Sequence, residues 1–93
     1  MRGTEKQQIW AKQIKNSFTE AMEKLATLQK DGVLPEQAQK VVDYLLGVES
    51  AQFWIDHKNT AEQGSGLLRI ICTSGCEIDG QIVKFNPVTG EVA

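Results

Sequence analysis

The sequence has little histidine, cysteine or proline, with one, two and two of these residues among 93, and it has no long apolar run. A membrane-spanning helix needs about 18 or more apolar residues, and a secretory signal peptide needs an apolar stretch near the N-terminus. We therefore expect a cytoplasmic protein with no membrane association. Thiols in that compartment are normally reduced, so Cys72 and Cys76 are expected to be free.

The sequence also lacks a basic excess, because its formal net charge is −2. Nucleic-acid-binding domains usually carry surplus positive charge on one face, so a protein partner is favoured over nucleic acid. The first 30 residues are the exception, with six basic side chains: Arg2, Lys6, Lys12, Lys15, Lys24 and Lys30. These do not form a single stripe on a helical wheel, and nucleic-acid or nucleotide binding through them is kept as the alternative function.

Length and composition predict a single domain over residues 1–93. Hydrophobic residues make up 41% of the chain and charged residues 24%, which is typical of a folded globular protein. A domain this small buries only roughly 60% of its unfolded surface, so a homodimer would add useful burial.

Residues 4–30 are expected to form one long helix. Thr4 and Gln7 have the spacing of a capping box, and Asp31-Gly32 is a typical helix end. Ile9 falls on the side opposite the apolar stripe, where it is either exposed or covered by another element such as a second subunit. The stripe recurs every three to four residues and consists of Ile14, Phe18, Ala21, Met22, Leu25 and Leu28, with Trp10 and Ala11 at its edges.

Two shorter helices are expected next. Pro35 suits the first turn of a helix that ends near Gly47. If that helix continued unbroken, Trp54 would point away from its apolar face, so a new helix capped by Ser50 is predicted over residues 51–58.

The remaining residues are expected to form a linker over 59–66 and a β part over 67–93. Residues 67–72 are predicted as a strand, with a buried helical turn as the alternative. Asp79-Gly80 predicts a hairpin over residues 76–85 with a type I′ turn, followed by a turn and a short third strand at 91–92. The core face of the hairpin is expected to carry Cys76, Ile78, Val83 and Phe85. The fold class is therefore α+β, with a long N-terminal helix and two shorter helices packed on a small antiparallel sheet.

Cysteine and histidine offer little catalytic signal. Cys72 and Cys76 are separated by three residues, whereas redox pairs and most zinc half-sites use two. A metal or redox protein that uses both cysteines and His57 is the second alternative. We expect no enzyme activity, no cofactor and no metal.

The segment from Trp54 to Lys58 is the candidate interaction surface, with the edge of the C-terminal sheet as the alternative. It combines an aromatic side chain, Trp54, with three polar ones, Asp56, His57 and Lys58, at a helix end. Exposed tryptophan is favoured at the energetic centre of protein interfaces. The alternative is that Trp54 packs on the first helix beside Trp10.

Two short motifs resemble a group of small proteins encoded by phages and other mobile elements. The motifs are Lys6-Gln7-x-x-Trp10-Ala11-x-x-Ile14 and Phe53-Trp54-Ile55-Asp56, and the similarity covers residues 4–58. The group has no defined activity, so the resemblance implies only a mobile-element accessory protein, a setting that includes inhibitors of host defence. The leading hypothesis is a non-catalytic protein-interaction module, with such an inhibitor as its specific form.

Overall fold

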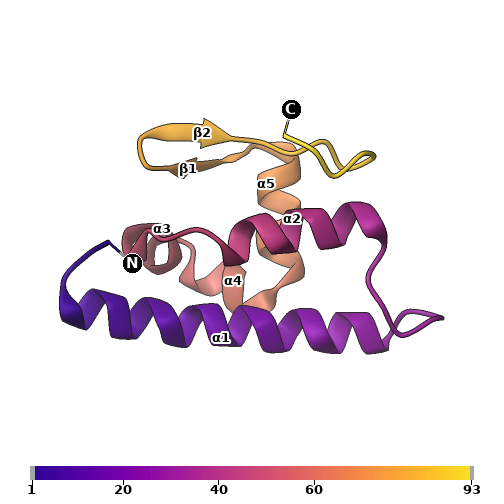
Figure 1. Ribbon diagram of the computed structural model, residues 1–93, viewed down its shortest axis with the longest axis horizontal. Coiled ribbons are helices and arrows are strands. Elements are labelled where there is room, and N and C mark those ends of the chain that lie inside the picture. The colour runs from indigo at the N-terminus through magenta and orange to yellow at the C-terminus, as the bar shows by residue number, and fades with distance from the viewer. Residues whose placement is uncertain (1, 93) are drawn as a thin grey trace.

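The computed structural model describes residues 2–92, and within them the fold is α+β, as predicted. Five helices, two more than predicted, are followed by one antiparallel hairpin (Figure 1), and the third helix ends at Asp56 rather than at residue 58. The elements are α1 (Glu5–Thr27), α2 (Glu36–Leu46), α3 (Ala51–Asp56), α4 (Lys58–Gln63), α5 (Ser65–Thr73), β1 (Cys76–Ile78) and β2 (Gln81–Val83).

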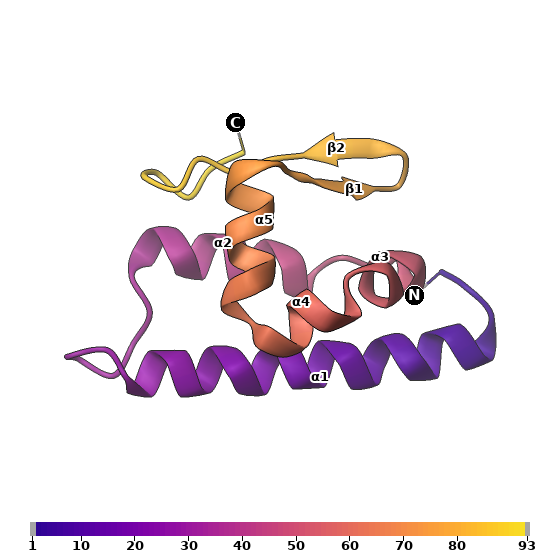
Figure 2. The same cartoon turned by 180° about the vertical axis from the view of Figure 1, so that it is seen from behind.

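The elements lie in layers. The long helix α1 runs along one side of the molecule, the hairpin lies on the opposite side, and α2 and α3 lie between them (Figures 1 and 2). Helix α5 crosses these layers from α4, beside α1, to the hairpin. Within residues 2–92, no helix has both the length and the apolar content that a membrane span requires.

The start of α1 is formed by local hydrogen bonds, as predicted. The Thr4 hydroxyl accepts a bond from the Gln7 amide at 3.2 Å, and the Gln7 side chain accepts one from the Thr4 amide at 2.9 Å. The helix ends at Thr27, earlier than expected, and Leu28 is 81% exposed. Because no other element covers Leu28, burial does not stabilise further helical turns. The side chains that α1 buries are Ala11, Ile14, Phe18 and Met22.

Trp54 lies at the centre of the core and has no exposed surface. Its ring contacts those of Phe18, at a centroid distance of 5.7 Å, and Phe53, at 5.2 Å. The indole N–H donates to the Val48 carbonyl oxygen at 3.3 Å. The break before α3, with Ser50 as its cap, is therefore confirmed, and it directs Trp54 inward.

The prediction of a flexible linker over residues 59–66 is wrong. Helix α4 ends at Gln63 and α5 begins at Ser65, so only Gly64 separates them. Gly64 has a φ of +70°, and a Cβ atom there would lie 2.7 Å from the Ala21 Cβ atom of α1. Glycine therefore marks a tight bend packed against α1 rather than a mobile segment.

The predicted strand over residues 67–72 is also wrong, and the helical alternative is correct. Leu67 and Ile71 are both fully buried and lie four residues apart, one helical turn on the same face. Packing against the other helices therefore outweighs the β preference of the branched residues in this run.

The hairpin agrees with the prediction in turn, register and core face. Asp79 and Gly80 have φ angles of +54° and +81°, as a type I′ turn requires. Cys76 pairs with Val83, and the core-facing side chains are buried or half-buried, whereas Ile82 on the outer face is 69% exposed.

The third strand predicted at residues 91–92 does not form. Asn86 donates a backbone hydrogen bond to the Glu91 carbonyl at 2.8 Å, which closes the predicted turn. Beyond it, Val92 makes only an isolated bridge with Phe85. One bridged pair is too short to make a strand, so the sheet has two strands.

Candidate functional site

Three of the four residues of the candidate interaction surface lie where α3 meets α4. Asp56 is the last residue of α3, His57 joins the two helices, and Lys58 is the first residue of α4. Asp56 is exposed, and the other two are half-buried. The short helix α3, which Ser50 caps through the Phe53 amide, holds these side chains at the surface.

Trp54, the fourth residue, does not belong to this surface. It is enclosed in the core, because its ring packs against Phe18 of α1. The alternative is confirmed in its main part, because Trp54 packs on the first helix, but its aromatic neighbours are Phe18 and Phe53 rather than Trp10.

Trp10 supplies the exposed aromatic ring that Trp54 was expected to provide. Its side chain is 44% exposed on α1. It lines a depression of about 500 Å³ together with Asp56, His57 and Lys58, and also with Ile55, Asn59, Thr60 and Ile70. We call this depression the Trp10 groove. The sequence feature that could have revealed Trp10 as part of this site is its position at the edge of the apolar stripe, where a side chain is only partly covered.

His57 lines this groove with a side chain that is uncharged at neutral pH. Its ring lies 4.9 Å from that of Phe53, measured between centroids. Burial lowers the pKa of His57 below its ordinary value of 6.5, and the nearby carboxylate of Asp56 opposes this shift only in part. The imidazole is therefore available as a neutral hydrogen-bonding group.

The two charged side chains of the Trp10 groove, Asp56 and Lys58, each contact a polar side chain on their own helix. The Gln52 side-chain amide donates to the Asp56 carboxylate at 2.6 Å. The Lys58 ammonium forms an ion pair with Glu62 at 3.2 Å. Both contacts are four residues apart along one helical face, the spacing that favours such pairs. The rim of the groove thus carries oriented polar groups of both signs.

A second depression, of about 550 Å³, lies on the other side of His57, between α3 and the hairpin. Its lining includes Asp56, Glu77 and Asp79 as well as the buried Cys76. Burial, with a further contribution from Cys72, raises the pKa of Cys76 to about 11. The Cys76 thiol is consequently protonated at neutral pH and is a poor nucleophile.

The structure does not bring Cys72, Cys76 and His57 together as a set of metal ligands. Cys76 and His57 both line the depression beside the hairpin, but Cys72 lines a different crevice next to α2. Both cysteines are free thiols, and burial also raises the pKa of Cys72. Among residues 2–92, no three His, Cys, Asp or Glu side chains are arranged to hold a metal ion.

No family model, curated protein or solved structure matches this chain. The interpretation of the site therefore rests on its own geometry.

Proposed function

We propose that this chain is a non-catalytic protein-interaction module and that the Trp10 groove is its contact surface. The observation that supports this most is the 44% exposed side chain of Trp10 beside Asp56, His57 and Lys58. Tryptophan is enriched among the few interface residues that dominate binding energy.

The composition of the groove suits protein recognition. Ile55 and Ile70 are half-buried and supply apolar surface next to Trp10, while charged and amide side chains surround them. An apolar centre with a polar rim is the usual anatomy of a protein interface. The partner is therefore expected to place an apolar side chain against Trp10 and polar groups against the rim.

Helix α1 makes the groove rigid before binding. Trp10 lies in the second turn of a 23-residue helix, at the edge of the face that is buried in the core. A pre-ordered contact residue loses little conformational entropy when a partner binds. On the resemblance of residues 4–58 to mobile-element proteins, we propose a host protein as the partner, with inhibition of that protein as the outcome of binding.

The test is affinity capture from lysates with and without nuclease treatment, in which wild type, Trp10→Ala and Ile9→Ala are compared by quantitative mass spectrometry for protein and by ultraviolet absorbance for nucleic acid. Loss of a tryptophan at the centre of an interface costs about 2 kcal/mol or more, which corresponds to roughly 30-fold weaker binding. Trp10→Ala should therefore lose the partner. Ile9→Ala should retain it, because Ile9 is 54% exposed on the same helix but does not line the groove.

Two results would refute the proposal. A folded Trp10→Ala variant that still captured the partner would show that the groove is not the contact surface. Capture of nucleic acid instead of protein, lost on nuclease treatment or in high salt, would favour the basic residues of α1 as the binding site.

A further inference from the structure

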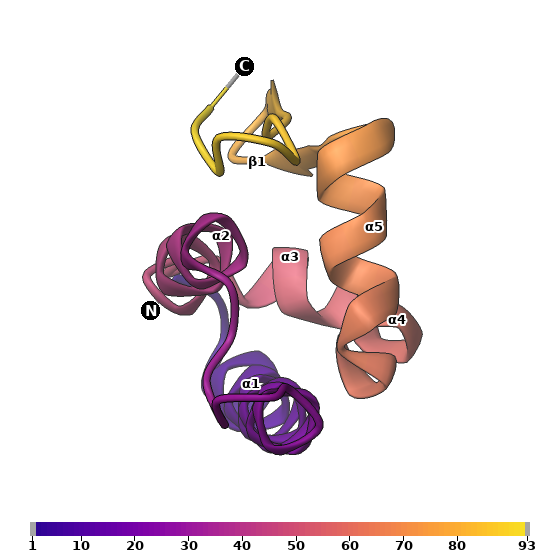
Figure 3. The ribbon, with the colours of Figure 1, turned by 90° about the vertical axis from the view of Figure 1, so that its right-hand side faces the viewer.

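A separate apolar crevice lies between α2 and α5. It has a volume of about 300 Å³. Figure 3 looks along α1 and shows α2 and α5 facing each other beneath the C-terminal segment. The apolar walls are formed by Pro35, Ala38, Val41, Leu68, Cys72 and Pro87, and Gln37 adds one uncharged polar side chain. We call it the α2–α5 crevice.

Among residues 2–92, Arg69 is the only charged residue that lines the α2–α5 crevice. Its side chain is exposed, and its guanidinium group makes no ion pair or hydrogen bond with the described residues. A guanidinium group presents parallel N–H donors that match a carboxylate in a two-bond geometry. An apolar crevice with one unpaired cation at its edge is thus complementary to an apolar chain that ends in an anion.

We propose that the α2–α5 crevice binds a medium-chain fatty acid, with the alkyl chain between α2 and α5 and the carboxylate on Arg69. The volume lies at the lower end of the range for small-molecule sites, which are mostly apolar with a few polar groups that set orientation. This site is independent of the Trp10 groove and does not rest on the proposed protein-binding function.

Cys72 provides an internal reporter of occupancy. Its thiol lines the α2–α5 crevice and is half-buried, whereas Cys76 is only 2% exposed. The raised pKa of Cys72 agrees with an apolar surrounding. A bound alkyl chain should therefore slow the reaction of Cys72 with iodoacetamide while leaving Cys76 unreactive in both states.

In the experiment, the full chain is titrated with octanoate, hexanoate, octanol and octylamine. Changes in amide chemical shifts in NMR spectra measure the binding of each compound. Octanoate should bind about 15-fold more tightly than hexanoate, since each buried methylene contributes about fourfold. It should also bind at least tenfold more tightly than octanol or octylamine, and the shifts should centre on residues of α2 and α5. Saturating octanoate should slow Cys72 alkylation at least fivefold.

Variants then separate the two parts of the site. Arg69→Glu should weaken octanoate at least tenfold, and Ala38→Phe, which fills the crevice, should abolish the protection of Cys72. Lys12→Glu, the same change of charge at an exposed position of α1, should bind octanoate like wild type. Equal affinity for octanoate and octanol, unchanged binding by Arg69→Glu, or an unprotected Cys72 in the wild-type protein would each overturn the proposal.

Discussion

His57 shows how one side chain can link the surface to the stability of the fold. It ends α3, precedes α4 and stacks against the buried ring of Phe53. Burial favours its neutral form, so its pKa in the folded chain lies below 6.5. At a pH between the ordinary pKa of 6.5 in the unfolded chain and the lowered pKa in the folded chain, the unfolded chain therefore binds a proton at His57 more readily.

We predict that His57 makes the protein less stable as the pH falls. Its contribution to the free energy of unfolding is fully present above pH 6.5 and is lost as the pH falls from 6.5 through the lowered pKa of the folded state. His57→Gln stays neutral and should lose less stability than wild type on acidification. Urea unfolding at pH 7.5 and pH 5 measures this difference. Parallel pH profiles for the two proteins would contradict the prediction.

The sequence left open whether Trp54 is exposed or packs on the first helix, and the structure buries it. Trp54 is next to charged residues in the sequence, yet it is fully buried, whereas Trp10 is at the edge of an apolar stripe and is 44% exposed. Periodicity places a side chain on a face of its own helix. It does not show which neighbouring helix covers that face, so the composition of the candidate site could be predicted for Asp56, His57 and Lys58 but not for its aromatic member.

At the scale of elements, Gly64 decides how α4, α5 and α1 fit together. Its left-handed backbone turns the chain between two helices, and its missing side chain lets the bend approach Ala21 and Met22 closely. A Gly-Ser-Gly run is typical of a loop, and sequence alone does not distinguish a flexible connector from a bend that needs close contact.

We predict that Gly64→Ala destabilises the protein by about 2–4 kcal/mol, from backbone strain of about 1 kcal/mol and overpacking of about 1–3 kcal/mol. The matched control is Gly32→Ala. Gly32 has a similar φ of +76°, but an added Cβ atom would meet nothing within 4 Å. Gly32→Ala should therefore lose only the stability that corresponds to backbone strain, about 1 kcal/mol. Urea unfolding of both variants gives the comparison, and equal losses would show that the contact with α1 contributes nothing.

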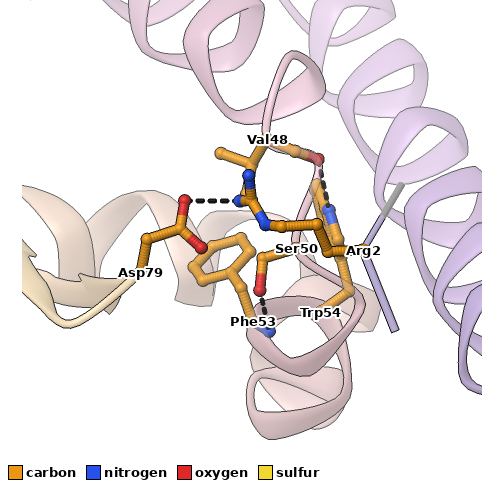
Figure 4. Close-up of polar contacts among 6 residues, drawn as sticks. All are labelled: Arg2, Val48, Ser50, Phe53, Trp54 and Asp79. Carbon is orange, nitrogen blue, oxygen red and sulfur yellow. Dashed lines mark hydrogen bonds and ion pairs between the residues drawn. The ribbon is translucent and has the colours of Figure 1, made fainter. Parts of the chain in front are cut away.

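At the scale of the whole molecule, the N-terminal segment connects three distant parts of the chain. The Arg2 amide donates to the Glu49 carbonyl at 2.7 Å, and the Ala51 amide donates to the Arg2 carbonyl at 3.0 Å. The Arg2 guanidinium also pairs with Asp79 at the hairpin turn (Figure 4). The start of α3 and the tip of the hairpin are thus both bound to the segment before α1.

We predict that the backbone bonds of Arg2 matter more than its ion pair. Both charged side chains are more than half exposed, so Arg2→Ala should change stability by at most about 1 kcal/mol. Removal of Arg2 and Gly3 also removes both backbone bonds, each with a net value of about 0.5–1.5 kcal/mol.

Urea unfolding and hydrogen exchange at the Ala51 amide test this difference. The shortened chain should be the less stable of the two, and its Ala51 amide should exchange faster. If Arg2→Ala were as unstable as the shortened chain, the ion pair would be the main interaction.

The sequence by itself determined the features that depend on neighbours within a few residues. The Thr4–Gln7 cap, the break before Ser50 and the Asp79-Gly80 hairpin all follow from local hydrogen bonds and backbone preferences, and all three are confirmed.

Tertiary structure alone decided where segments with ambiguous local preferences belong. Residues 67–72 became helical because Leu67 and Ile71 share one buried face, and Gly64 became a tight bend because α1 lies against it. Trp10 joined Asp56, His57 and Lys58 only through the packing of α1 beside α3 and α4. These outcomes depend on contacts between residues far apart in the chain, which local preferences do not encode.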